Sequence, residues 1–195
     1  MWRPSVQQTN LPTSLRQFVT DVTMWVGEEA VESKLLPKIG ASMGRLVAND
    51  DWLDPAFARP HPEYYQQYLL YADPNDRFSV VSFVWGPGQH TPIHDHTVWG
   101  VIGMLRGSEL AQNYEIAADG VPHAFSEEIE LSPGDVEYVS PTIGDVHRVR
   151  NALDDRVSIS IHAYGANIGK VKRHVFPPEG GAPKDFVSGY ANVEA

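Results

Sequence analysis

The chain has 195 residues, with 25 acidic against 15 basic side chains and a formal net charge of −10. This excess of negative charge argues against binding to the phosphates of nucleic acids or to anionic membranes. Cysteine is absent, which excludes disulfides, thiolate metal ligands and a cysteine nucleophile. No apolar run approaches the ~20 residues of a membrane-spanning helix, and the N-terminus lacks the apolar core of a signal peptide. We therefore expect a cytoplasmic protein.

The first helix is predicted to begin near residue 13. Apolar residues recur at three- and four-residue steps from Leu15 to Trp25, which is typical of the buried face of an α-helix. Thr13 or Ser14 is the expected N-cap, and Gly27 the expected end.

Two shorter helices are predicted in the rest of this N-terminal layer, which extends to about residue 55. One covers 28–36 and ends at Pro37, because proline cannot continue the hydrogen bonding of a helix. The other covers 40–50.

From about residue 77 the sequence is typical of β-structure, with short stretches rich in β-branched and aromatic residues between turn residues. The expected strands are 77–86, 98–105, 109–116, 123–131, 135–140, 147–152 and 157–165. Many short strands indicate a sandwich or barrel. We predict a single domain over 1–195: the helical layer, a barrel over about 60–170, and a wrapping tail over 171–195.

His94 and His96 lie one residue apart in a strand-like stretch. On a strand such side chains share a face, and neutral imidazole is the commonest metal ligand, so the pair could form half of a metal site. A hydrogen-bonded core histidine beside one at a strand end is an equally good reading of this pattern alone. The nearest acidic residues are Asp95, which would face the other way, and Glu109, well downstream.

The surrounding residues resemble the two motifs of the cupin superfamily. The first motif is matched by Gly88, His94, His96 and Gly107. Gly100 stands where most cupins have a glutamate. The stretch 134–151 resembles the second motif, with two extra residues, and places His147 at the third histidine position. The resemblance implies a mainly β fold, the cupin double-stranded β-helix barrel, here with an N-terminal helical layer.

A more specific resemblance rests on "PIHDHTVWG", "GDVHRV" and "SISIHAYG", within about residues 60–175. Together these are similar to the thiol dioxygenases, the family of cysteine dioxygenase and 3-mercaptopropionate dioxygenase. The resemblance implies one Fe(II) per chain, held by His94, His96 and His147, and the oxidation of a small thiol by O2 to a sulfinate. The usual non-haem iron oxygenase holds its metal with two histidines and one carboxylate, not with three histidines. Three neutral histidines suit a substrate that brings its own anionic ligand, a thiolate.

Ser160, His162 and Tyr164 occupy alternate positions of a predicted strand, so they share one face. In the family the matching residues form a hydrogen-bonded relay whose tyrosine lies near the iron, which implies a catalytic role here. The alternative is a polar strand that faces solvent. Mammalian-type cysteine dioxygenases crosslink this tyrosine to a cysteine, and Gly100 occupies that position here, so Tyr164 must be unmodified.

Gln67 and Arg173 are the candidate substrate-binding residues. Gln67 stands where the mammalian-type enzymes place an arginine for the substrate carboxylate, and glutamine is typical of the 3-mercaptopropionate branch. In that branch an arginine shortly after the tyrosine binds the carboxylate, and Arg173 has that position. Equally, Lys170, Lys172 and Arg173 could form a solvated basic cluster.

The resemblance therefore favours 3-mercaptopropionate as substrate, with cysteine second. More distant alternatives are a metal-dependent cupin isomerase or epimerase and a binding cupin without catalytic activity. Neither has a reason to keep the serine–histidine–tyrosine relay.

Overall fold

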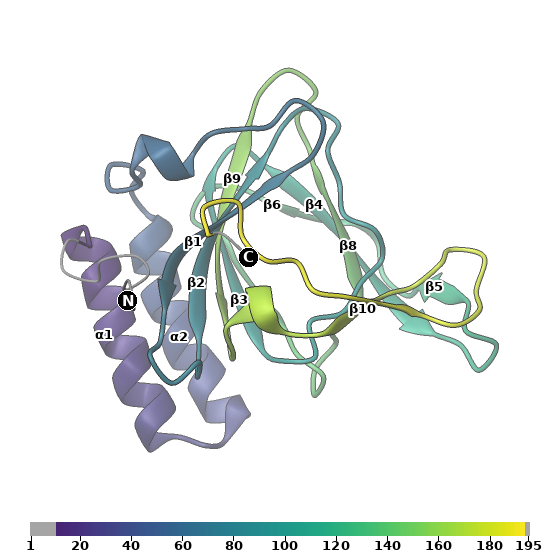
Figure 1. The fold of residues 1–195 in the computed structure, drawn as a ribbon, viewed down its shortest axis with the longest axis horizontal. Coiled ribbons are helices and arrows are strands. Elements are labelled where there is room, and N and C mark those ends of the chain that lie inside the picture. The colour runs from purple at the N-terminus through teal and green to yellow at the C-terminus, as the bar shows by residue number, and fades with distance from the viewer. Residues whose placement is uncertain (1–10, 194–195) are drawn as a thin grey trace, which may run out of the picture.

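The computed structural model describes residues 11–193 (Figure 1). Residues 1–10, which bear on the expectation about a signal peptide, lie outside this range. The helices are α1 (Thr13–Glu28) and α2 (Glu32–Val47), and short 3-10 turns span Pro55–Phe57 and Ile168–Lys170. The strands are β1 (Gln66–Ala72), β2 (Ser79–Trp85), β3 (Gly100–Arg106), β4 (Glu109–Ile116), β5 (Pro122–Ala124), β6 (Ile129–Leu131), β7 (Val136–Val139), β8 (His147–Asn151), β9 (Ser158–Tyr164), β10 (Arg173–Val175) and β11 (Lys184–Phe186). The predicted mainly β fold with an N-terminal helical layer is confirmed.

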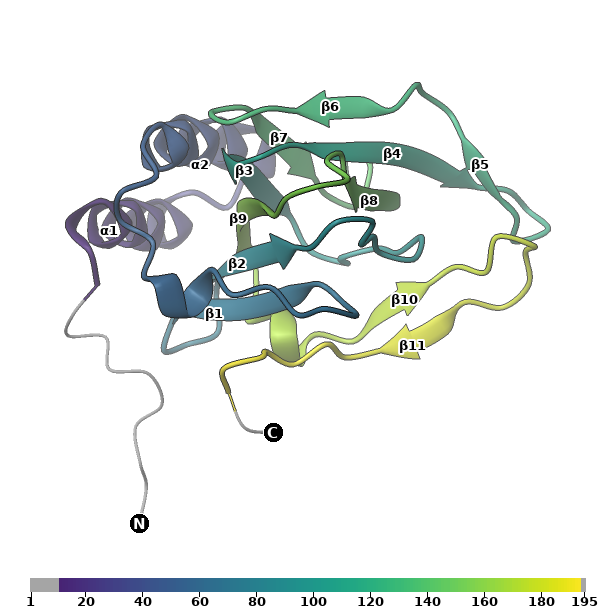
Figure 2. The ribbon, with the colours of Figure 1, turned by 90° about the horizontal axis from the view of Figure 1, so that it is seen from above.

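The strands form antiparallel sheets. One sheet has the order β1-β2-β9-β3-β7, with β9 at its centre. In another, β4 pairs with β5, β6 and β8, while β10 and β11 form a hairpin. Both views show the helices at one end of the molecule and the hairpin toward the other (Figures 1 and 2). None of the helices described is long and apolar enough to cross a membrane.

β9 is buried along its whole length because both of its faces are covered. Ile159, Ile161 and Ala163 belong to the core shared with α1 and α2. The alternate residues of the strand therefore face the barrel interior, where Tyr164 packs in a second apolar cluster with Phe83. This sidedness directs the polar residues of β9 into the barrel.

α2 differs from the prediction because it runs unbroken through Pro37. The expected end at Pro37 and the separate helix over 40–50 are therefore wrong. An internal proline costs a helix ~3 kcal/mol, and the burial of a whole apolar face on both sides of Pro37, including Leu36, Ile39 and Met43, offsets this cost.

α2 packs closely against the sheet at Gly103 of β3. A Cβ atom there would lie 2.6 Å from Cγ of Met43 and 2.8 Å from Cγ1 of Val47, so only glycine lets the helix approach this far. α1 begins at Thr13 and its N-cap position is Pro12, without a side-chain hydrogen bond. The expected N-cap role of Thr13 or Ser14 is therefore wrong.

Three β-segments also differ from expectation. The predicted strand over 123–131 is divided into β5 and β6. The tail forms the β10–β11 hairpin where only a wrapping segment was expected, and β1 adds a strand before the first predicted one. These segments matter for the site because β1 and the tail carry its candidate substrate-binding residues.

Candidate metal centre

His94, His96 and His147 form a buried cluster in the barrel interior. One ring nitrogen of each lies within 4.8 Å of the others, and the ring centroids are 4.8–4.9 Å apart. Within residues 11–193 this is the only group of three or more side chains placed to hold a metal ion.

Backbone pairing brings the two histidine motifs together. A strand was expected at His94 and His96. The two residues lie instead in the segment between β2 and β3, outside any regular strand. The backbone N–H of His94 donates to the carbonyl of His147, and the N–H of His147 donates to the carbonyl of His94, each at 3.0 Å. Asp95 faces away from the cluster, and its carboxylate accepts from the backbone N–H and the ring Nδ1–H of His174 at 2.8 and 2.7 Å. The segment is thus fixed between β8 and β10.

Asp145 orients His96. Its Oδ1 accepts from the backbone N–H of His96 at 3.1 Å and from the ring Nδ1–H at 2.9 Å, while Oδ2 accepts from the N–H of Thr97 at 2.8 Å. Thr97 has a φ of 60°, which is rare for a β-branched residue, so the carboxylate also holds this turn. With Nδ1 engaged, Nε2 of His96 is the nitrogen left for a metal. Similarly, Nδ1 of His94 donates to the Pro92 carbonyl at 3.1 Å.

The chemistry of the cluster fits a divalent transition metal. Burial lowers the pKa of His94 and of His147 well below the usual histidine value, and the neighbouring His96 adds to both shifts. These imidazoles are therefore neutral, which is the form that binds a metal. Nδ1 of His147 is buried without a hydrogen-bond partner. Such nitrogen ligands suit Fe(II) and its neighbours among the transition metals.

Ser160, His162 and Tyr164 form a hydrogen-bonded chain on the interior face of β9. Ser160 Oγ lies 2.7 Å from Nε2 of His162, and Nδ1 of His162 lies 2.8 Å from Oη of Tyr164. The Tyr164 ring stacks on His96 with centroids 5.4 Å apart, so the chain ends beside the histidine cluster. Burial raises the pKa of Tyr164, which keeps its proton. All three residues are buried, which rules out a strand that faces solvent.

Trp85 also joins this chain. Its indole N–H donates to Ser160 Oγ at 3.2 Å.

Arg173 is buried beside the cluster, with 3% of its surface exposed. Its Nη2 donates to Ser188 Oγ at 2.6 Å, and its Cζ lies 4.5 Å from the centroid of the Phe186 ring. Its Nε has no hydrogen-bond partner, and no salt bridge involves it in the described part of the chain. Burial dominates the pKa shifts of His94 and Tyr164, and the Arg173 charge contributes to both, so the guanidinium is near each of them.

Arg173 differs in this respect from its basic neighbours. Lys170 and Lys172 are exposed and pair with Asp76 and Asp185. The three residues therefore do not form one solvated basic cluster.

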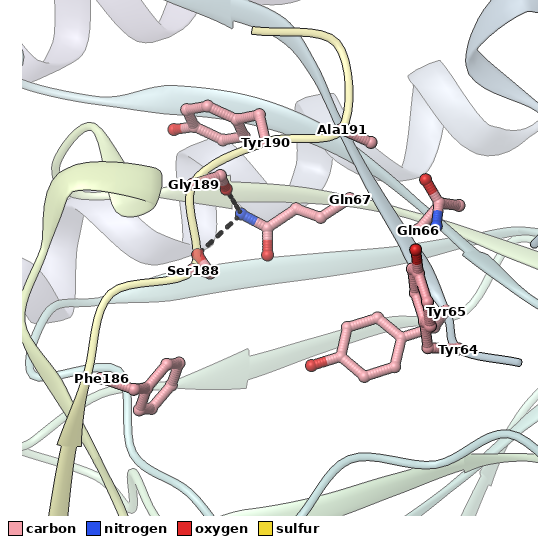
Figure 3. Close-up of a pocket in the computed structure, with 9 residues that line it drawn as sticks. All are labelled: Tyr64, Tyr65, Gln66, Gln67, Phe186, Ser188, Gly189, Tyr190 and Ala191. Carbon is pink, nitrogen blue, oxygen red and sulfur yellow. Dashed lines mark hydrogen bonds between the residues drawn. The ribbon is translucent and has the colours of Figure 1, made fainter. Parts of the chain in front are cut away.

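A cavity of about 550 Å³ lies between β1 and the C-terminal tail (Figure 3). Its lining includes Tyr65, Gln67, Phe186, Ser188, Gly189 and Tyr190. Gln67 Nε2 donates to Ser188 Oγ at 3.1 Å and to the Gly189 carbonyl at 3.0 Å. Ser188 thus contacts both Gln67 and Arg173, and the structure brings the two predicted substrate-binding residues together through it.

The comparisons with known proteins agree with this site. A family model described as cysteine dioxygenase type I matches residues 5–175. The chain belongs to this family. The cysteine dioxygenase type I family groups thiol dioxygenases of the cupin superfamily that use non-haem iron and three histidines, which confirms the resemblance found in the sequence.

Solved structures with a similar fold share little sequence with this member of the cysteine dioxygenase type I family. An uncharacterised protein from Klebsiella pneumoniae with a double-stranded β-helix domain is 17% identical, with a TM-score of 0.48 over 66% of this chain and 99% of that chain. A cupin 2 conserved barrel domain protein from Rhodopseudomonas palustris is 16% identical, with a TM-score of 0.45 over 60% of this chain and 69% of that chain.

Proposed function

We propose that the protein is an Fe(II)-dependent thiol dioxygenase that converts a small thiol carboxylate into its sulfinate. The preferred substrate is 3-mercaptopropionate, and cysteine is the alternative. Two S–O bonds form, the sulfur gives up four electrons, and O2 accepts all four, so no further reductant is required. The observation that carries the proposal is the buried, unpaired Arg173 beside a three-histidine cluster.

His94, His96 and His147 would hold the iron, one per chain. When bound, the ion would supply the redox and Lewis-acid chemistry that lets O2 react with a thiolate sulfur. The cluster contains no carboxylate, so three neutral ligands leave the positive charge of the ion uncompensated. This charge favours the thiolate over the thiol form of a bound substrate.

Arg173 would pair with the substrate carboxylate. A buried guanidinium without an anionic partner carries a desolvation penalty, and a carboxylate bound to its free Nε would offset it through charge-assisted hydrogen bonds. Gln67 is neutral and already bound to Ser188 and Gly189, so it offers no ion pair. The cavity meets Arg173 through Ser188, and none of the residues that line it is acidic. If the substrate enters this cavity, the ammonium group of cysteine would have no ion-pair partner there. This difference favours 3-mercaptopropionate.

The chain of Ser160, His162 and Tyr164 would position the reacting groups. Because the Tyr164 hydroxyl stays protonated beside the cluster, it can hydrogen-bond to substrate or O2, and His162 holds the ring in place. An isomerase or a binding module has no use for such a chain, which favours the dioxygenase over those alternatives.

Metal analysis and O2 uptake test the proposal. The purified protein should contain iron and consume one O2 for each sulfinate formed from 3-mercaptopropionate. His147→Ala should lose both iron and turnover, whereas His123→Ala, which changes an exposed histidine of β5, should alter neither. An iron-loaded protein that oxidises none of 3-mercaptopropionate, cysteine and cysteamine would overturn the proposal. A clear preference for cysteine would overturn only the choice of substrate.

A further inference from the structure

Glu109 is a buried carboxylic acid at the end of the relay that is remote from the histidine cluster. It is the first residue of β4, only 2% of its surface is exposed, and its Oε1 has no hydrogen-bond partner. Its partners across the sheet are Leu131 of β6 and Asn151 of β8, and neither can carry a charge. The proposed function leaves this acid without a role.

Glu109 lies against the two groups at that end of the relay. Ser160 and Trp85 both lower the pKa of its carboxyl, which is the effect of a hydrogen-bond donor near an acid. The amide of Asn151, its neighbour on β8, donates to the Trp85 carbonyl at 3.0 Å. The sheet register and the side-chain contacts thus agree on the position of Glu109, next to the indole that binds Ser160.

The surroundings favour the neutral form of this acid. The pKa of Glu109 is raised to about 8. Burial is the largest cause, and the charge of Glu137 on β7 also raises the pKa, whereas Ser160 and Trp85 lower it by hydrogen bonding. On β9 the facing titratable groups are His162, whose pKa is lowered mainly by burial, and Tyr164, whose raised pKa is due mainly to burial and in small part to Glu109. At neutral pH Glu109 is therefore mostly protonated and can donate a hydrogen bond.

A protonated Glu109 gives the relay one direction. An indole N–H can only donate, so Ser160 Oγ accepts from Trp85, and a proton on the Glu109 carboxyl would allow it to donate to the same oxygen. The Ser160 hydroxyl must then donate to Nε2 of His162. His162 carries its proton on Nδ1 and donates it to Tyr164 Oη, which leaves the tyrosine's own O–H free to point at the cluster.

An ionised Glu109 gives the opposite direction. A carboxylate can only accept, so the Ser160 hydroxyl turns toward it. Nε2 of His162 then carries the proton and donates to Ser160, and Nδ1 accepts from the Tyr164 hydroxyl. The tyrosine proton now points away from the cluster.

We propose that Glu109 is a positioning residue that sets the direction of the relay: when protonated it makes Tyr164 a hydrogen-bond donor toward the metal centre, and when ionised it withdraws that donor. A donor aimed at the centre stabilises negative charge that develops on a reacting oxygen. The effect on turnover rests on the proposed function, whereas the direction of the relay is a property of the folded chain.

Nitrogen NMR of the His162 ring tests the direction without any thiol chemistry. The sample is the full-length chain labelled at histidine nitrogens, with Zn(II) in place of iron, and His162→Asn assigns the signals. We expect the Nδ1–H tautomer at low pH and a change to the Nε2–H tautomer with a midpoint near pH 8. Glu109→Gln should keep the Nδ1–H tautomer throughout, because an amide can donate but cannot ionise.

Glu137→Gln is the matched control, because it removes the neighbouring half-buried acid. It should keep the tautomer change, with a lower midpoint since a nearby negative charge is lost. A His162 ring that holds one tautomer over the whole range in the native chain would overturn the proposal. A change that persists unaltered in Glu109→Gln would overturn it as well.

The pH profile of turnover tests the consequence for catalysis. In the native enzyme kcat for 3-mercaptopropionate should fall on the order of a hundredfold as pH rises past about 8, the scale of losing one preorganised donor. Glu109→Gln should remove this fall and leave the iron content unchanged. A tautomer change without any such fall would refute the catalytic part. A native protein that oxidises no thiol would refute the proposed function, and the NMR result would still decide the direction of the relay.

Discussion

Replacing Glu109 by glutamine should make the protein more stable at alkaline pH. The carboxyl has a pKa of 4.5 in its ordinary state and about 8 in the folded chain, so it is harder to ionise when folded than when unfolded. Protonation is therefore favoured by folding. The stability that this provides is fully present below about pH 4.5 and is lost as pH rises to about 8.

The interval between the two pKa values corresponds to roughly 4–5 kcal/mol of unfolding free energy. Glutamine has nearly the same shape and does not ionise, so its contribution does not change with pH. The variant should therefore be about as stable as the native protein at pH 5 and gain most of that free energy by pH 8. The buried histidines, whose pKa values are lowered by burial, contribute equally to both proteins and cancel in the difference.

Urea unfolding followed by tryptophan fluorescence measures this difference. Both proteins are unfolded in the same metal state, at intervals from about pH 5 to about pH 9, and Glu137→Gln serves as the matched control with a native glutamate at 109. The reasoning is refuted if the difference in unfolding free energy between Glu109→Gln and the native protein stays constant over this range. A difference that falls with rising pH would refute it more strongly, because the sign would be reversed.

Four further substitutions test the centre. Tyr164→Phe should keep iron and lower kcat, because the hydroxyl does not hold the metal; loss of iron would make this residue a ligand. Gly100→Glu should not improve turnover and should lower the melting temperature, since even its Cβ would lie 2.8 Å from Cγ2 of Val139 and 3.0 Å from Cε1 of Tyr164; a faster enzyme would contradict this. Arg173→Ala should lower kcat/KM for 3-mercaptopropionate about a hundredfold or more. It should hardly change kcat/KM for cysteamine, which has no carboxylate. Gln67→Ala should lower kcat/KM for 3-mercaptopropionate by the equivalent of only ~1 kcal/mol, and a larger loss in Gln67→Ala than in Arg173→Ala would place the carboxylate elsewhere.

Sequence patterns predicted the strands and helices correctly where the conformational preference of the local sequence agrees with the packing of the folded chain. Alternation and turn residues located β2 to β4 and β7 to β9, because strands bounded by glycine and proline have few other conformations open to them. At Pro37 the two preferences conflict. A rule about hydrogen bonding predicted a break, but the apolar face on both sides of the proline is buried against the sheet, and packing decides.

The histidine ligands could be predicted because their spacing in each motif is short and specific. The residues that support them could not, since their contacts join distant parts of the chain. Ser188 meets Gln67 across 121 positions of sequence, from a tail that shows no strand pattern. Asp145 stands only two residues before His147, which was an available signal. Glu109 was noticed as a nearby acid, but only the register of β4 places it against the relay.

The charges of the site support the proposal that a thiol carboxylate without an ammonium group fits it better than cysteine. His94 and His147 are neutral, and at neutral pH Tyr164 and Glu109 keep their protons. The Asp145 carboxylate is engaged by His96 and Thr97, so the fixed charges that face a ligand would be the metal ion and Arg173. A thiolate and a carboxylate match these two positive charges one for one. An added ammonium would be buried without a counterion, which is costly in a low dielectric. A glutamate at position 100 would neutralise part of the metal charge and remove the reason for the thiol to ionise. In the proposed enzyme the glycine at this position and the unpaired arginine would thus serve the same requirement: the anions that face the metal come from the substrate.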